Sequence, residues 1–230
     1  MDVRALFDQI LQSGRDLVAK SQNLAEEKLE LPKDQVQRDT AFSSMGKGAA
    51  MAGVAAVLLG TRIGRGLTGV ALKLGSLGAI GSLAYKTFQD WQAKNPGTAA
   101  VADAGLAVDA LSGPQLEKRS LALLRAMIAA AKADGHIDEK EQGAIDAYLQ
   151  KLDLDPEAQR FVHDELAKPL SARDIAAAAD SPAAAAEIYL TSLLAIDVDN
   201  DQERAYLDEL AAELKLAPEL AAELRNQARA

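Results

Sequence analysis

The chain carries the stretch ADGHIDEKE at residues 133–141 and a related stretch, IDVDNDQE, at residues 196–203. Each follows an alanine- and leucine-rich segment and runs on into another segment with leucines at helical spacing. When the glutamates that end the two stretches are aligned, three later pairs coincide without a gap: Leu152 with Leu214, Leu154 with Leu216, and Pro156 with Pro218. An internal duplication explains this match. It predicts two acidic helix junctions of similar construction.

The acidic residues of these junctions are the candidate functional groups. Asp134 and Asp197 each follow directly on a predicted helix, where the helix macrodipole makes a carboxylate unfavourable by a few tenths to about 1 kcal/mol. Something is expected to offset this cost. Because two similar junctions can converge on one site, and converging carboxylates usually bind a cation, a metal site is one interpretation.

Helix capping is the competing interpretation. Residues 138–141 and 200–203 both have the spacing in which a capping side chain and a glutamate three residues later satisfy backbone donors at a helix start. Capping therefore accounts for the second half of each junction. It accounts poorly for Asp134 and Asp197, which lie on the other side of the turn.

An EF-hand calcium loop is a third interpretation of the second junction. Asp197, Asp199 and Asp201 match the first half of that loop, and Asp208 falls at its twelfth position. The sixth position holds Gln202 where the loop needs glycine, and the helical pattern has already begun by then. We therefore do not expect an EF-hand.

The runs at residues 131–141 and 196–207 resemble the TerB-like helical domain of tellurite-resistance proteins. The whole chain, with a Gly/Ala-rich segment before that domain, resembles the YebE-like inner-membrane proteins of bacteria. The resemblance covers residues 115–230, and residues 1–114 more loosely. It implies an all-α domain without enzymatic activity and a role in envelope, metal or oxyanion stress. It also implies a divalent-metal-binding surface formed by Asp134, Glu141, Asp197 and Glu203.

Three further aspartates are expected to assist the metal or cap helices: Asp138, Asp199 and Asp201. Oxygen-only ligands suit a hard cation such as Ca²⁺. The chain has no cysteine, which excludes disulfides, thiol catalysis and cysteine zinc sites. A hydrolase that uses paired carboxylates is not favoured, because no nucleophile and base pair accompanies the acids.

Composition predicts an all-α protein, because only 4% of the residues are aromatic and the core must be built from alanine and leucine at close helix spacing. We expect an amphipathic helix and polar linker at 1–40, a Gly/Ala-rich basic segment at 41–93, a linker at 94–114 and the acidic domain at 115–230. The linker includes a short helix at 99–111. About seven helices are expected in the domain, at 116–133, 139–151, 156–167, 171–179, 182–196, 201–214 and 218–229.

Charge divides the chain into two parts, although its net charge is −9. Residues 41–93 carry five basic groups and one acidic group, whereas residues 115–230 carry 13 basic and 23 acidic groups. A basic apolar segment joined to an acidic domain indicates a membrane surface on one side and the cytosol on the other. The acidic domain argues against nucleic-acid binding.

The Gly/Ala-rich segment favours a shallow or re-entrant membrane contact over a two-span hairpin. Residues 48–60 are apolar but form a helix of only about 20 Å, against roughly 30 Å of hydrocarbon. Residues 66–85 are long enough but contain Lys73. We expect the basic side chains to lie near lipid headgroups, and Tyr85, Phe88 and Trp91 at the boundary. The GxGxxG match at 64–69 is a chance match, because no βαβ pattern follows.

The resemblance implies a bacterial inner-membrane protein, and together with the charge pattern it predicts an acidic domain in the cytoplasm and an unidentified protein partner. One alternative is a soluble cytoplasmic homo-oligomer in which the glycine-rich segment packs as a helical hairpin. Another is a metal-independent structural adaptor that docks a protein partner at the membrane.

Overall fold

The computed structural model describes residues 4, 5, 8, 77–95, 104–133, 156–169, 171–196 and 201–229, and over these residues it is helical with short non-helical stretches. The elements are α5 (Leu77–Lys94), the 3-10 turn η1 (Val108–Ala110), α6 (Gly113–Ala131), α8 (Pro156–Ala167), α9 (Ala172–Ala176), α10 (Pro182–Ala195), α11 (Asp201–Glu213) and α12 (Pro218–Arg229). This confirms the all-α class. The predicted helix at 139–151 and nearly all of the predicted N-terminal helix lie outside the described residues.

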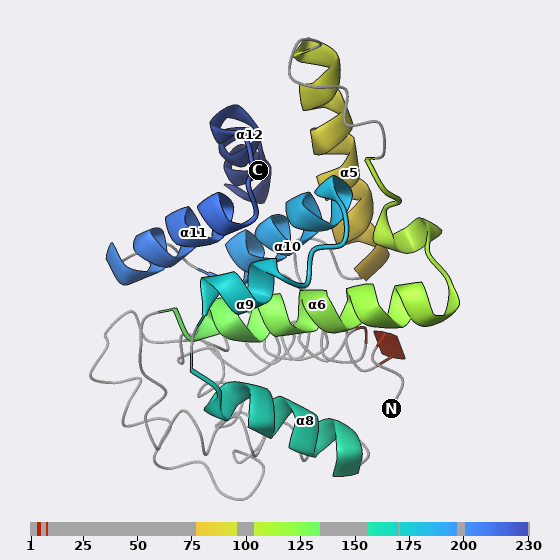
Figure 1. The fold of residues 1–230 in the computed structure, drawn as a ribbon, viewed down its shortest axis with the longest axis vertical. Coiled ribbons are helices and arrows are strands. Elements are labelled where there is room, and N and C mark those ends of the chain that lie inside the picture. Colours follow the sequence, from red (N-terminus) through yellow and green to blue (C-terminus); the bar gives the residue numbers. More distant parts are fainter. Residues whose placement is uncertain are drawn as a thin grey trace, which may run out of the picture.

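Helix α10 is the centre of the bundle. Every residue from Ala183 to Ala195 is buried, and α10 packs against α5, α6, α9, α11 and α12 (Figure 1). A helix that is apolar on all sides is stable only when other elements surround it. The four consecutive alanines from Ala183 to Ala186 present little side-chain volume, which lets neighbouring helices approach closely.

Prolines and capping serines mark the starts of several helices. Prolines occupy the first positions of α8, α10 and α12, where a missing amide hydrogen costs nothing. The Ser181 side chain accepts a hydrogen bond from the Ala184 amide at 3.1 Å. Ser171 does the same for the Asp174 amide at 3.1 Å. Both serines therefore cap the helices that follow them.

Helix α5 belongs to the core of the bundle. Its buried face carries Ile80, Ala84, Phe88 and Trp91, and it packs against α10 and α12. The expectation that Phe88 and Trp91 lie at a lipid boundary therefore fails, because these rings are only 2% and 7% exposed and are covered by protein. Tyr85 is half-buried on the same helix.

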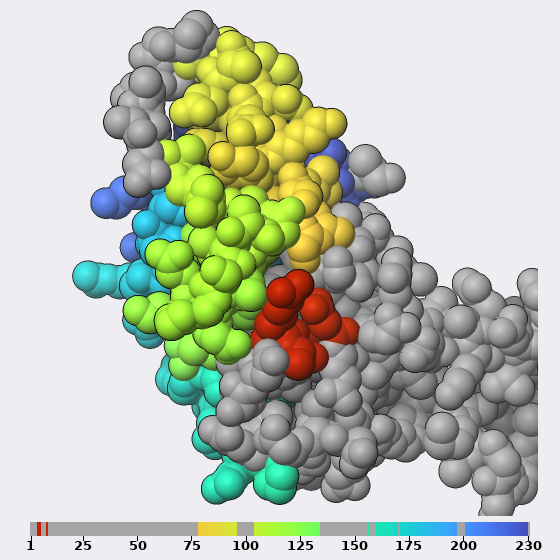
Figure 2. Space-filling model, turned by 90° about the vertical axis from the view of Figure 1, so that its right-hand side faces the viewer, coloured from red at the N-terminus to blue at the C-terminus, as the bar shows by residue number. Residues whose placement is uncertain are grey.

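The connecting segment, defined here as residues 104–111, also packs against the bundle. Only η1 is helical within it, so the described part of the predicted helix at 99–111 is mostly non-helical. Figure 2 shows this segment and α6 adjoining α5 on one face of the molecule. The Ala104 carbonyl accepts a hydrogen bond from the Ala183 amide at 2.9 Å, which joins the segment to the start of α10.

Candidate functional site

The two acidic junctions begin at the same end of the bundle. Helices α6 and α10 pack side by side, and both end toward the side where α11 begins (Figure 1). The first junction leaves from the end of α6, and the second connects α10 to α11. The predicted metal-binding residues Asp134, Asp138, Glu141, Asp197 and Asp199 lie outside the described residues. The helices that lead into both junctions therefore meet, while most of the predicted ligands are not placed.

The two predicted ligands within the described residues have different environments. Glu203 is 6% exposed and lies in the first turn of α11, on the same face as the buried Tyr206 and Leu207. Asp201 is 97% exposed and pairs with Arg204 at 2.6 Å, one turn along the helix. The structure thus directs Glu203 toward the bundle and Asp201 toward solvent. Among the residues described, no group of three or more His, Asp or Glu side chains forms a metal cluster.

Two buried residues lie one turn along α11 from Glu203. Tyr206 and Leu207 are 4% and 2% exposed, and burial raises the pKa of the Tyr206 hydroxyl above its usual range. A carboxylate in the first turn of a helix interacts favourably with the helix macrodipole, by about 0.3–1 kcal/mol. This location can hold a negative charge on the buried face of α11.

Lys132 fixes the end of α6 directly before the first junction. Its ammonium donates hydrogen bonds to the backbone carbonyls of Glu165, at 3.4 Å, and of Lys168. These carbonyls lie at the C-terminal end of α8, where a cation complements the helix macrodipole. Burial lowers the pKa of Lys132, and the nearby Glu165 carboxylate opposes this effect.

A buried ion pair that our sequence reasoning missed lies at the other end of α10. Arg119 on α6 is 2% exposed, Glu187 on α10 is fully buried, and Arg119 Nη1 donates to Glu187 Oε2 at 2.5 Å. Arg119 Nη2 donates to Asp180 and, at 3.2 Å, to Ser181 Oγ. Burial raises the pKa of the Glu187 carboxyl, and Arg119 partly opposes that shift.

This ion pair also holds the connecting segment. The Val108 amide donates to Glu187 Oε1 at 2.7 Å, and Arg119 Nη1 donates to the Leu106 carbonyl at 3.3 Å. Glu187 is the only charged residue of α10. An isolated charge inside an otherwise apolar helix indicates a buried partner, and this was the signal in the sequence.

No described helix is both long and apolar enough to cross a membrane. His163 is exposed on α8, and His136 lies outside the residues described.

Comparison with known proteins places the chain in a family. It is 32% identical over 101 residues to a protein of Yersinia enterocolitica named "Uncharacterized protein in ampR 5'region", and the alignment covers 44% of this chain and 73% of that protein. No solved structure matches the chain. A family described as "Protein of unknown function (DUF533)" matches residues 44–228. Because this match spans most of the sequence, the chain belongs to the DUF533 family.

Proposed function

We propose that this protein is a non-enzymatic, membrane-associated protein whose C-terminal helical domain binds a divalent cation between its two acidic junctions. The resemblance to the TerB-like domain suggests this function, and the arrangement of α6, α10 and α11 supports it. A hard cation such as Ca²⁺ suits the predicted ligands, because they are all carboxylates.

The observation that carries the proposal is the burial of Glu203. Of the two predicted ligands on described residues, this carboxylate lies on the buried face of α11, whereas Asp201 is exposed. An ionised carboxylate loses hydration when it is buried and must be compensated by hydrogen bonds or by a cation. Its place in the first turn of α11, directly after the second junction, makes it a candidate ligand of a cation bound there.

Membrane contact is proposed for the part of the Gly/Ala-rich segment that precedes α5. The buried face of α5 is occupied by α10 and α12, so that helix is engaged with the domain. Residues 41–76 carry four of the five basic groups of the predicted membrane segment, Lys47, Arg62, Arg65 and Lys73. They remain the candidate for lipid contact.

The metal proposal is tested by calorimetric titration of Ca²⁺, Mg²⁺, Mn²⁺ and Zn²⁺ into the chelator-treated full chain, together with thermal melts. We expect one ion to bind and to raise the melting temperature as ligand linkage requires. Glu203→Gln, and the double variant Asp134→Asn with Asp197→Asn, should each weaken binding by tenfold or more. Glu219→Gln is the matched control, because Glu219 is an exposed carboxylate in the first turn of α12.

A metal-independent adaptor is the second candidate, favoured by the position of Glu203 in the first turn of α11, where a carboxylate can cap the helix. It predicts no heat on titration with any of the four ions and an unchanged melting temperature. Glu203→Gln would then lower the melting temperature equally with and without each ion.

Membrane contact is tested by flotation of the full chain with lipid vesicles. We expect the protein to float with anionic but not with zwitterionic vesicles. Recovery of all the protein in the lipid-free fraction would contradict membrane contact.

A further inference from the structure

A cavity lies between α6, α8 and α9. It is separate from the buried ion pair of Arg119 and Glu187. The cavity has a volume of about 380 Å³. Its apolar floor is formed by Ile128, Ala129, Pro169 and Ile175. This volume falls at the lower end of the range for small-molecule sites, so a compact ligand would fit.

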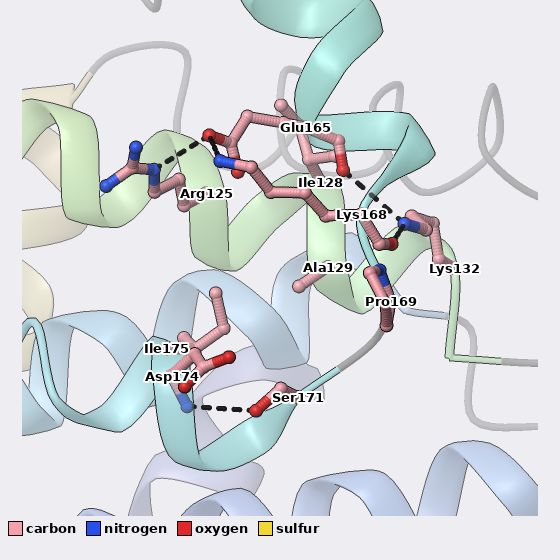
Figure 3. A pocket seen from close by; sticks show the side chains of 10 residues that line it. All are labelled: Arg125, Ile128, Ala129, Lys132, Glu165, Lys168, Pro169, Ser171, Asp174 and Ile175. Atoms are coloured by element: carbon pink, nitrogen blue, oxygen red, sulfur yellow. Dashed lines mark hydrogen bonds and ion pairs between the residues drawn. The ribbon is translucent and has the colours of Figure 1, made fainter.

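Two cationic side chains contact one buried carboxylate beside this cavity, and a third, Lys132, binds the backbone carbonyls of Glu165 and Lys168. Glu165 on α8 is 8% exposed, and its Oε1 accepts hydrogen bonds from Arg125 Nε at 3.0 Å and from Lys168 Nζ at 2.5 Å. Figure 3 shows Glu165 between these two side chains, with Lys132 beyond Lys168 toward the end of α6. The carboxylate therefore holds two cations in fixed positions.

The guanidinium of Arg125 is fixed from a second direction. It lies over the ring of Phe161, with 5.8 Å from its central carbon to the ring centre. Its terminal nitrogens make no hydrogen bond within the part of the chain that the structure describes. Such a guanidinium is held in place and still has a planar pair of donors available, the geometry that recognises carboxylate and phosphate groups.

Neutralisation of Glu165 does not account for all of this positive charge. One carboxylate requires one cation, yet Arg125 and Lys168 both contact it, and Lys132 lines the same cavity. The opposite wall adds one carboxylate, Asp174 on α9, which is exposed. Three cations thus face two carboxylates, which leaves a positive surplus in a domain that is otherwise strongly acidic.

We propose that this cavity binds a small organic anion with a phosphate or carboxylate head. The head group would accept hydrogen bonds from Arg125 and Lys168, and the carbon part would cover the apolar floor. Arg125 on α6 and Lys132 at the C-cap of that helix are seven residues apart, about 10 Å along the helix axis, a span that suits a ligand the size of a simple metabolite. This site is independent of the proposed metal site, and either can be absent without the other.

The test is calorimetric titration of the full chain, in the presence of chelator, with glycerol 3-phosphate, with malate and with uncharged glycerol. We expect heat from at least one of the two anions and none from glycerol. Comparison of the two anions shows whether the head group is a phosphate or a carboxylate. Arg125→Gln and Lys168→Gln should each weaken binding by about tenfold, which corresponds to about 1.4 kcal/mol.

Lys118→Gln is the matched control. Lys118 is an exposed cation on α6, two turns from Arg125, and its loss changes the net charge by the same amount. Far-ultraviolet circular dichroism of each variant checks folding, and Lys168→Gln serves where Arg125→Gln fails to fold. No binding of either anion by the unsubstituted chain would overturn the proposal. Equal weakening by Lys118→Gln would also overturn it, because the attraction would then be unspecific.

Discussion

Arg119 Nη1 and Glu187 Oε2 lie 2.5 Å apart, and the two residues are 2% and 0% exposed. They come from α6 and α10, the two helices whose C-terminal ends lead into the acidic junctions. Glu187 also accepts the Val108 amide, so one carboxylate connects α6, α10 and the segment that follows α5. The register of α6 against α10 depends on this contact at one end of the pair, while the junctions lie at the other end.

Removal of Arg119 is expected to be strongly destabilising. Arg119→Met leaves the Glu187 carboxylate buried without its cation, and breaking one partner of a buried ion pair typically costs about 3–5 kcal/mol. Urea unfolding followed by circular dichroism should show that loss. Arg173→Met removes an exposed arginine from α9 and should change stability by less than about 1 kcal/mol.

The double variant Arg119→Met with Glu187→Leu separates the ion pair from simple packing. When both charges are replaced by apolar groups of similar volume, most of the lost stability is expected to return, because no uncompensated charge remains. A double variant as unstable as Arg119→Met would show that the polar network, and not charge burial, determines stability at this position.

Stability should also depend on pH through Glu187. Burial raises the pKa of this carboxyl in the folded state above its value in the unfolded chain, so the folded state binds the proton more tightly. The resulting contribution to stability is full below the unfolded pKa and is lost as the pH rises through the folded pKa. As the pH rises from the unfolded pKa through the folded pKa, Glu187→Gln should therefore gain stability relative to the unsubstituted chain. An opposite trend in urea unfolding would contradict this.

Gly105 is expected to tolerate no side chain. Its φ is +75°, and an added Cβ would lie 2.4 Å from the Ser181 side chain. Gly113 has a φ of +54° with no atom within 4 Å of its added Cβ, so it experiences the backbone strain alone. Gly113→Ala should cost about 1–2 kcal/mol, and Gly105→Ala should cost about 1–3 kcal/mol more because of the overlap. Equal melting temperatures for the two variants would show that the connecting segment moves away at little cost.

Helix positions were predictable from the sequence because the signals are local. Prolines at 156, 182 and 218 start helices at those positions, and the six expected domain helices within the described residues are present with ends that agree to within three residues. Each signal depends on neighbouring side chains, such as a serine cap before a proline. The all-α class follows from the same signals.

Pairings between distant residues were not predictable in the same way. Arg119 and Glu187 are 68 positions apart, and the sequence alone does not show that α6 brings them together. The predicted lipid contact of Phe88 and Trp91 is wrong for a related reason. Aromatic rings next to a glycine-rich basic segment suit a lipid boundary as well as the core of a helical bundle, and the sequence does not distinguish the two. Two of the predicted metal ligands, Glu203 and Asp201, differ in burial, since Glu203 is buried and Asp201 is exposed. In the sequence both are simply acidic residues at the start of a helix.

Lys215 should gain stability when it is replaced by glycine. It has a φ of 55° and is the second residue after α11. Its amide donates a hydrogen bond to the Ala212 carbonyl, and the Leu216 amide donates one to the Ala211 carbonyl, both at 3.0 Å. This is the helix-ending motif in which glycine is favoured, because a side chain at positive φ is strained. Relief of about 1–2 kcal/mol of strain outweighs the larger chain entropy of glycine in the unfolded state, so Lys215→Gly should stabilise by up to about 1 kcal/mol. Lys118→Gly, inside α6, should instead destabilise by about 1 kcal/mol. If thermal melts showed that both substitutions change the melting temperature in the same direction, the backbone at residue 215 would be able to relax, and the lysine there would not be strained.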